Sequence, residues 1–493
     1  MGRVETGTIS TKVPARLDRL PWSRWHWMIV IGLGTVWILD GLEVTIVGNI
    51  SAQLAKPGSG IHITQAQVTG FGAAMYVAGA CAGALFFGWL TDRFGRKKLF
   101  MITLGVYLTA TAMTALSFAP WWFFLFRFMT GFGIGGEYAA INSAIDELIP
   151  SRHRGLIDIV INGTYWAGAA AGALITVPAT SDLPVGVGWR LCFALGVILG
   201  LVILLVRRNV PESPRWLFIH GRARQAEDLV DSVEQRVEAG TGTRLTEPSR
   251  SITIRQRQTI GFLTIARAMF TLYPRRTILG FSLFIGQAFL YNAITFGYAQ
   301  ILTTFFHVKT NTGYYFAVIA VGNLIGPLLL GRLFDSVGRK PMIAGTYMLS
   351  GVLLLATAYL FHRGALDATT MTACWCVVLF FASAGASSAY LTVSEVFPME
   401  TRALAIAFFY ALGTAAGGIS GPLLFSALVS TGHVTDTVIA FSAGAGLMIA
   451  AGIIEILLGV PAERQALEAV AQPLTAQDVS VAPADPAPAA RER

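Results

Sequence analysis

Charged residues are scarce in this chain. Only 13% of its 493 residues are Asp, Glu, Lys or Arg, whereas soluble domains contain roughly 25%. Hydrophobic residues make up 54% of the sequence, more than a water-soluble core could hide. This composition argues against a soluble protein and predicts a membrane protein.

Cysteine and histidine are scarce as well. The seven histidines avoid the depths of the apolar runs, which argues against a histidine proton relay. The four cysteines all fall within apolar runs, so neither a disulfide framework nor a metal site is expected, and no cofactor is predicted. They are Cys81, Cys192, Cys374 and Cys376.

Twelve apolar runs are long enough to cross a bilayer as helices, which takes about 20 residues each. They cover residues 26–50, 66–90, 98–118, 121–145, 157–179, 189–207, 277–303, 314–332, 341–361, 369–393, 403–429 and 435–460. The prediction is an all-α membrane protein with twelve transmembrane helices.

The runs divide the chain into five parts. We expect a cytoplasmic N-terminal segment (1–25), a first six-helix bundle (26–210), a polar linker (211–276), a second six-helix bundle (277–460) and a largely disordered tail (461–493). Within the linker, the run from Ala223 to Ala239 predicts a surface helix.

Basic residues indicate how the chain is oriented. The first 25 residues contain five Lys or Arg and no apolar core, so they are not a cleavable signal peptide. Counted over twelve spans, the far side of the membrane holds only Lys56, Arg190, Lys309 and Arg363. Because Lys and Arg accumulate in cytoplasmic loops, both termini are predicted to be cytoplasmic. The net charge of +8 then reflects topology and contact with membrane lipid, without nucleic acid as a partner.

Two short charged loops occupy matching places in the two halves. One is GWLTDRFGRKK, from Gly88 to Lys98, and the other is GRLFDSVGRK, from Gly331 to Lys340. The pair resembles the signature loop of the major facilitator superfamily of secondary transporters. This resemblance implies two pseudo-symmetric six-helix halves that alternate about a central site. It also implies a monomer in the plasma membrane, which in bacteria is the inner membrane.

Other junctions are similar to two branches of this superfamily. The segments from Pro211 to Arg215 and from Ser394 to Pro398 look like the sugar porters, and the sequence GFGIGGE from Gly131 to Glu137 looks like metabolite symporters. The glycines also predict close packing of a neighbouring helix.

The resemblance implies a set of gate residues that form and break contacts between the halves, while the alternative is ordinary solvated helix ends. These are Gly88, Asp92, Arg93, Arg96, Glu147, Arg152, Asp335, Arg339, Glu395 and Arg402.

Proton coupling is expected where ionisable groups enter the membrane, because a charge there is costly without a partner. At about 1.5 Å of rise per residue, Asp40 and Glu43 in the first span lie at the same depth as Arg127 in the fourth. One guanidinium can neutralise one carboxylate, so the other is predicted to carry a proton. A static ion pair bracing the two spans is the alternative. Glu137, further along the fourth span, is either a second proton site or a hydrogen-bonded helix contact.

The resemblance sharpens these assignments. In proton-coupled sugar porters an acid in the first span faces an Arg in the fourth, and Glu43 matches that position better than Asp40. The sequence Asp-Gly-Leu-Glu from Asp40 to Glu43 resembles the acidic pair of the aromatic-acid symporters.

Five polar residues are the candidate substrate ligands, namely Asn162, Gln287, Asn292, Tyr298 and Tyr390. The spacing of Gln287 and Asn292 matches the seventh-span pair of the sugar porters, while Asn162 and Tyr390 replace their Gln and Trp. Fewer polar groups than a sugar requires are expected here. Single amides could equally form interhelical hydrogen bonds. Dense aromatics permit a flat ligand or serve only as packing or lipid-facing surface. They are Phe289, Tyr291, Phe296, Tyr298, Phe408, Phe409 and Tyr410.

The sequence therefore predicts a transporter and not an enzyme. The favoured function is proton-coupled symport of a small organic or aromatic acid, with either Arg127 or the pair Gln287 and Asn292 meeting its polar end. Three alternatives remain open: a sugar or polyol porter, proton-coupled efflux of a cationic compound, and a non-transporting receptor on the same fold.

Overall fold

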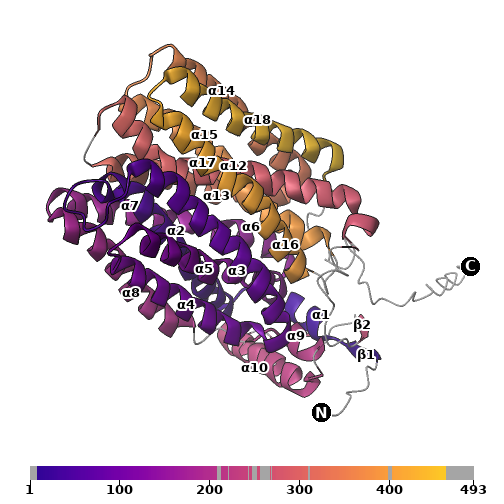
Figure 1. Ribbon diagram of the computed structural model, residues 1–493. Coiled ribbons are helices and arrows are strands. Elements are labelled where there is room, and N and C mark those ends of the chain that lie inside the picture. Colours follow the sequence, from indigo (N-terminus) through magenta and orange to yellow (C-terminus); the bar gives the residue numbers. More distant parts are fainter. Residues whose placement is uncertain are drawn as a thin grey trace, which may run out of the picture.

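Two bundles of long helices lie side by side in the computed structural model, one from each half of the chain (Figure 1). Short elements of the N-terminal segment and the linker gather at one end of these bundles. The structure describes residues 8–207, 212–219, 221–242, 244–246, 252–255, 267, 269–308, 311–397 and 402–461. The tail that was expected to be disordered lies, after residue 461, outside the described residues.

The first bundle follows the predicted order of six spans, two of which consist of more than one helical element. A π-helical turn, η1, precedes α3, and α6 meets α7 at Thr164. The elements are α2 (Arg24–Leu54), η1 (Gln67–Gly72), α3 (Ala73–Phe94), α4 (Arg96–Ala115), α5 (Pro120–Leu148), α6 (Ser151–Gly163), α7 (Tyr165–Ser181) and α8 (Val185–Arg207).

The second bundle repeats this organisation, and its fifth span is again interrupted, here by the π-helical segment η2. Its elements are α12 (Pro274–Phe305), α13 (Thr312–Ser336), α14 (Arg339–His362), α15 (Ala368–Val396), α16 (Arg402–Thr414), η2 (Ala415–Ile419), α17 (Ser420–Ser430) and α18 (Val434–Leu458). The chain is thus a membrane protein of twelve helical spans in two six-helix halves.

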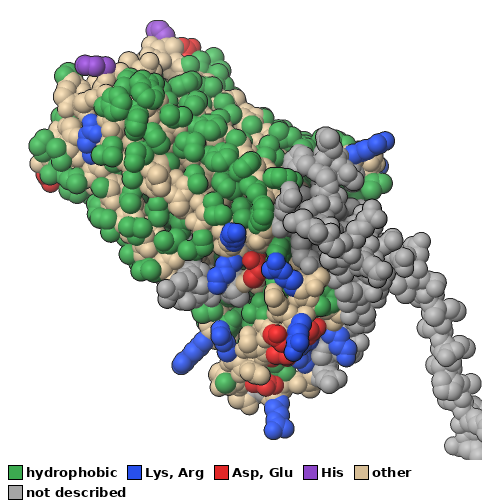
Figure 2. Space-filling model, turned by 60° about the horizontal axis from the view of Figure 1, so that its bottom comes forward, with side chains coloured by type: hydrophobic (Ala, Val, Ile, Leu, Met, Phe, Trp, Pro, Cys, Tyr) green, Lys and Arg blue, Asp and Glu red, His purple; other side chains and the backbone are tan. Residues whose placement is uncertain are grey.

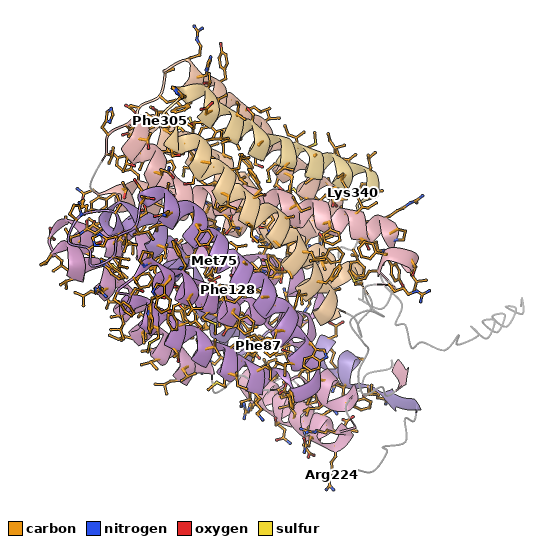
Figure 3. All side chains as sticks on the ribbon, viewed as in Figure 1. Met75, Phe87, Phe128, Arg224, Phe305 and Lys340 are labelled. Atoms are coloured by element: carbon orange, nitrogen blue, oxygen red, sulfur yellow. The ribbon has the colours of Figure 1, made fainter. Side chains whose placement is uncertain are left out.

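The outer surface fits a hydrocarbon environment. Among the described residues, eleven spans are long and apolar enough to cross a membrane, and α5 is the twelfth, with Arg127 and Glu137 inside it. Hydrophobic side chains cover the flank of the bundles, whereas Lys, Arg, Asp and Glu gather at one end (Figure 2). Arg224 lies at that charged end and Phe305 at the opposite end (Figure 3).

Glycines let α3 and α5 approach very closely, as the sequence predicted. A Cβ atom added to Gly131 would lie 2.0 Å from the carbonyl oxygen of Tyr76, and one added to Gly135 would lie 1.8 Å from that of Ala80. No side chain fits at those distances, so the two helices are in backbone contact. This contact places the polar residues of α5 directly against α3.

The repeated charged loop forms the same turn in both halves. Gly95 ends α3 and begins α4 with φ of 91°, and Gly338 separates α13 from α14 with φ of 122°. Residues with a side chain rarely adopt this conformation. The two glycines therefore explain why each half needs this motif between its second and third spans.

The N-terminal segment is fastened to the linker. Strand β1 (Thr8–Thr11) pairs antiparallel with β2 (Ile252–Arg255), and α1 (Val13–Asp18) contacts α9 (Pro214–Ile219) and α10 (Ala223–Thr241). The surface helix expected from Ala223 is α10.

One arginine holds this assembly together. Arg16 donates hydrogen bonds to Glu227 at 2.5 Å, to Asp231 at 2.5 Å and to Glu234 at 2.6 Å. Partial burial opposes ionisation of Glu234, but hydrogen bonds from Arg16 and Arg19 outweigh it and lower the pKa of Glu234. We refer to Arg16, Arg19 and these three acids as the N-terminal clamp.

Candidate functional site

A buried ion pair joins α2 and α5. The Nη1 group of Arg127 donates a hydrogen bond to Oε1 of Glu43, and both side chains are 0% exposed. A charge this deep requires an opposite charge at contact distance, because water cannot reach it. The contact predicted from the depths of these residues is therefore present. Its part in proton coupling stays a prediction.

Asp40 lies one helical turn before Glu43 and has different partners. Tyr76 of α3 donates its hydroxyl to Oδ1 of Asp40 at 2.7 Å, and Tyr138 of α5 donates to Oδ2. The side chain is 3% exposed, and the structure shows no ion pair between Asp40 and any basic residue that it describes. The two acids thus differ: Glu43 is compensated by a cation and Asp40 by two neutral donors.

Tyr76 connects these two arrangements. Its ring lies 4.7 Å from the guanidinium carbon of Arg127, a cation–π contact, while its hydroxyl reaches Asp40. Sequence reasoning missed Tyr76 and Tyr138. A tyrosine at the same membrane depth as the two acids was the available signal, since a buried phenol needs a polar partner.

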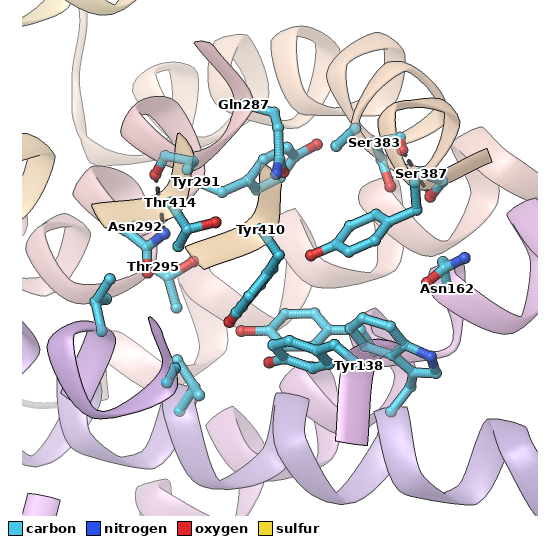
Figure 4. Close-up of a pocket in the computed structure, with 18 of the residues that line it drawn as sticks. Tyr138, Asn162, Gln287, Tyr291, Asn292, Thr295, Ser383, Ser387, Tyr410 and Thr414 are labelled. Atoms are coloured by element: carbon cyan, nitrogen blue, oxygen red, sulfur yellow. Dashed lines mark hydrogen bonds between the residues drawn. The ribbon is translucent and has the colours of Figure 1, made fainter. Parts of the chain in front are cut away.

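Between the two halves is a cavity of about 120 Å³ (Figure 4). Residues of both bundles line it, including four of the five predicted substrate ligands: Asn162, Gln287, Asn292 and Tyr390. The fifth, Tyr298, is not among the lining residues and shares a hydrogen bond of 2.5 Å with Thr372. Tyr298 lies almost two helical turns beyond Tyr291, toward the end of α12 that carries Phe305.

Aromatic rings form the walls of the cavity. Trp37 and Tyr138 stack with centroids 4.7 Å apart and an interplanar angle of 10°, and Tyr410 meets Tyr138 edge-on at 4.6 Å. The ring centroids of Trp166 and Tyr291, two further lining residues, lie 5.2 Å apart. Walls of this kind suit a small flat ring. Of the seven aromatics that could bind a ligand or only pack, Tyr291 and Tyr410 line the cavity. The other five are not among the lining residues, namely Phe289, Phe296, Tyr298, Phe408 and Phe409.

The polar groups of the cavity are neutral. Gln287 points into it, and Asn292 lines it while donating to the carbonyl oxygen of Ala288 at 2.9 Å (Figure 4). Sequence reasoning overlooked four hydroxyl residues that also line the cavity, namely Thr295, Ser383, Ser387 and Thr414.

The lining includes no Lys, Arg or His among the described residues. Arg127 is covered by Glu43 and Tyr76 and does not reach the cavity. Arg127 and the pair Gln287 and Asn292 were the two candidates for binding the polar end of a substrate, and only the pair lines the cavity.

Other buried acids lie away from the cavity lining. Thr103 of α4 donates to Oε1 of Glu137 at 3.1 Å, which is the hydrogen-bonded helix contact considered for Glu137. Glu455 of α18 is 1% exposed. Asp158 of α6 is also 1% exposed, and sequence reasoning missed it because it stands at the edge of an apolar run.

Some of the proposed gate residues do connect the halves. Arg339 donates to Oδ1 of Asp335 at 2.7 Å, and Oδ2 of Asp335 accepts the backbone N–H of Leu156 in the first bundle at 3.2 Å. Arg152 donates to the carbonyl oxygen of Leu20 at 3.0 Å, which links α6 to the N-terminal segment.

Gly88 of α3 faces α16, where an added Cβ would lie 3.0 Å from the Cβ of Ala407. The remaining gate candidates have side chains outside the described part of the structure: Asp92, Arg93, Arg96, Glu147, Glu395 and Arg402.

A second contact between the halves, which was not predicted from the sequence, lies toward the end of α12 that carries Phe305. Thr69 of η1 donates to Oε1 of Gln300 at 2.9 Å, and the hydroxyl of Ser426 in α17 lies 3.0 Å from both groups. The two halves are thus in contact on both sides of the cavity, through Asp335 on one side and Gln300 on the other.

Twelve spans in two halves, with a cavity between them and a buried ion pair beside it, are the arrangement of secondary membrane transporters. The described residues contain no group of His, Cys, Asp and Glu able to hold a metal ion.

The chain belongs to the family described as "Sugar (and other) transporter", whose sequence model matches residues 25–468. It is 26% identical to the niacin transporter NiaP of Acinetobacter baylyi, over 92% of this chain and 99% of that protein. It is also 26% identical to the 4-hydroxybenzoate transporter PcaK of the same organism, over 82% and 85% of the two chains. Among solved structures it resembles the proton:xylose symporter XylE, with a TM-score of 0.71 at 19% identity, covering 90% of this chain and 98% of that one. This likeness confirms the major facilitator fold.

Proposed function

We propose that this protein is a proton-coupled symporter of a small aromatic or other organic acid. The observation that carries the proposal is the position of Asp40. It is a buried carboxyl group with no basic partner among the described residues, and only two tyrosines separate it from a ring-lined cavity. Relatives named for niacin and 4-hydroxybenzoate transport, both flat aromatic acids, support this substrate class.

Asp40 is the group that we propose exchanges the proton. Glu43 has a guanidinium at contact distance, so its negative charge is compensated. The charge of Asp40 is met only by neutral donors, and an uncompensated charge inside the membrane is costly. Arg127 and Glu43 then keep α2 and α5 in register, and Glu137 acts as a hydrogen-bonded contact and not as a second carrier.

Substrate would lie between the aromatic walls, with its polar end toward Gln287 and Asn292. An acid that enters a cavity without basic residues brings an uncompensated negative charge. Taking up a proton at Asp40 together with the acid removes one negative charge from the site. Co-transport of acid and proton is therefore favoured on electrostatic grounds.

A cationic substrate is the second candidate. Aromatic walls beside an ionised Asp40 could hold a cation through ring faces and charge, and the lining lacks a basic residue to repel it. In that case proton and cation would compete for Asp40, which is the arrangement required for proton-driven efflux. The direction of the proton effect separates the two functions.

Alternation would consist of the halves, residues 26–210 and 277–460, rocking about the cavity as the contacts at Asp335 and at Gln300 break in turn. We propose a monomer in a bacterial inner membrane, with the clamp and the linker in the cytoplasm and with basic side chains facing anionic lipid.

The test is uptake into proteoliposomes of labelled niacin, 4-hydroxybenzoate, xylose and a quaternary amine, with and without an inward proton gradient. We expect gradient-driven accumulation of one or both acids. Asp40→Asn should abolish accumulation but keep exchange of the acid across the membrane. Accumulation of the acids that is unaffected by Asp40→Asn would refute the proton assignment. Proton-driven loss of the amine would instead establish the efflux function, and xylose uptake alone would establish a sugar porter.

A further inference from the structure

Asp40 is bound by two tyrosines that also line the cavity. Tyr76 donates to one carboxylate oxygen at 2.7 Å and Tyr138 donates to the other. An ionised carboxylate can only accept hydrogen bonds, so both phenolic hydrogens point toward Asp40. While Asp40 is charged, neither hydroxyl can donate to a molecule in the cavity.

We propose that a proton on Asp40 converts Tyr138 into a hydrogen-bond donor for an anionic substrate; this inference rests on the symport function proposed above. A protonated Asp40 carries one O–H group and must donate it. When Tyr138 accepts that hydrogen bond, its own O–H rotates about the C–O bond and points into the cavity. The only covalent change is the O–H bond formed at Asp40, with a proton from water, and the reverse step returns that proton to water.

The surroundings of the two rings indicate that the O–H group of Tyr138 reorients and that the O–H group of Tyr76 does not. The guanidinium of Arg127 lies against the Tyr76 ring at 4.7 Å, and a nearby positive charge makes a phenol a stronger donor. Tyr76 therefore keeps donating to Asp40. Tyr138 instead packs between Trp37 and Tyr410, with ring centroids 4.7 and 4.6 Å away, and its hydroxyl also interacts with the hydroxyl of Tyr410, another lining residue, so it belongs to the wall of the cavity.

Other ionisable groups near Asp40 do not take over this role. Glu43 is occupied by Arg127, and Glu137 accepts from Thr103. Four more tyrosines lie in the same region, but the described structure shows hydrogen bonds to Asp40 only from Tyr76 and Tyr138. These four are Tyr107 of α4, Tyr165 of α7, Tyr390 of α15 and Tyr410 of α16.

The proposal explains how proton and acid can be coupled without touching each other. Protonation of Asp40 removes a negative charge and at the same time supplies a donor inside the cavity. An acid bound to Tyr138 in turn favours the protonated form of Asp40, because linkage between two ligands is reciprocal. A neutral ligand of the same shape should gain much less from the switch than an anion does.

The experiment measures binding to purified full-length protein by calorimetry, using niacin and its neutral analogue nicotinamide, above the pH at which niacin itself is protonated. Wild type should bind niacin more tightly as the pH falls, with a smaller change for nicotinamide. Tyr138→Phe keeps the ring but lacks the hydroxyl, and should weaken niacin binding at acid pH by about 10- to 100-fold, the effect of losing a hydrogen bond to a charged group.

Two further variants make the test specific. Asp40→Asn places an N–H donor where the acid would carry its proton, so this variant should bind niacin tightly at every pH, and adding Tyr138→Phe should remove that affinity. Tyr107→Phe is the matched control, because Tyr107 is buried in α4 outside the cavity lining and its hydroxyl has no hydrogen-bond partner within the described residues. It should bind as wild type does.

The binding and uptake results together distinguish failure of the Tyr138 switch from failure of the proposed symport. Wild-type affinity and pH dependence in Tyr138→Phe, or weak niacin binding by Asp40→Asn at all pH values, would overturn the switch while leaving proton-driven accumulation intact. Niacin binding that follows pH through Tyr138, without any accumulation in proteoliposomes, would support the switch and refute symport. A wild-type protein that binds neither niacin nor 4-hydroxybenzoate would overturn the switch together with the aromatic-acid substrate class on which it rests.

Discussion

Removing Arg127 alone should be far more harmful than removing Arg127 together with Glu43. Both side chains are fully buried and contact each other, so Arg127→Leu leaves a carboxylate inside the bundle with no cation. Breaking a buried pair in this way costs about 3 to 5 kcal/mol, whereas replacing both partners with apolar residues of similar size is often neutral or stabilising. We therefore expect Arg127→Leu to be strongly destabilised and the double variant with Glu43→Leu to recover.

Thermal unfolding of the purified proteins in detergent measures this difference, and uptake into proteoliposomes separates structure from function. If the pair only braces α2 and α5, the double variant should be stable and should still accumulate substrate. If the pair takes part in coupling, the double variant should be stable but should not accumulate substrate. An Arg127→Leu variant as stable as wild type would refute the reasoning, because it would mean that the Glu43 charge is compensated by another route.

Three further predictions concern packing, the clamp and the second contact between the halves. Gly135→Leu should prevent assembly of α3 against α5, because its Cβ would lie 1.8 Å from a backbone oxygen, whereas Gly105→Leu, which has no neighbour within 4 Å, should give normal yields of folded protein. The lowered pKa of Glu234 means that its contribution to stability is present above a pH of about 4.5 and is lost as the pH falls through its folded-state pKa. In limited proteolysis, the Arg16→Gln variant should be cleaved faster than wild type at neutral pH, and its cleavage rate should lose this pH dependence. Gln300→Leu should weaken the contact between the halves near Phe305, so cysteines introduced into the cavity should react faster with a reagent added from that side.

Much of the fold follows from the sequence because a membrane imposes simple rules. Long apolar runs must become helices, since no water satisfies the backbone inside lipid. The repeated loop identified the two halves, and Gly95 and Gly338 show why it recurs. Breaks within spans, such as η1 and η2, were not predictable. A π-helical turn changes the register by one residue and leaves no compositional trace.

The site was predictable where charge is involved and much less so elsewhere. The rise per residue of a helix was enough to predict that Glu43 lies at the depth of Arg127, because both spans run roughly along the membrane normal. It did not reveal that Asp40 is held by Tyr138, since a tyrosine in a span is usually packing or an interfacial anchor. Asp158 was not predicted to be buried, because it stands at the edge of an apolar run in the sequence. Tyr298, although it lies near the right face of its helix, stands too far along it to reach the cavity.

The two halves contribute different chemistry to the cavity. The acids and the guanidinium beside it come from α2 and α5, whereas Gln287, Asn292 and the serines of α15 come from the second half. Under the function proposed above, the charged groups of the proton step therefore belong to the first half, whereas the cavity walls are shared, because Trp37, Tyr138 and Asn162 also line the cavity. Substitutions in the second half could then change the polar groups that meet the substrate, such as Gln287 and Asn292, without altering Asp40. A library confined to α12, α15 and α16 would leave Asp40, Tyr76 and Tyr138 unchanged, so under the proposed mechanism its members should keep the proton step while differing in substrate preference.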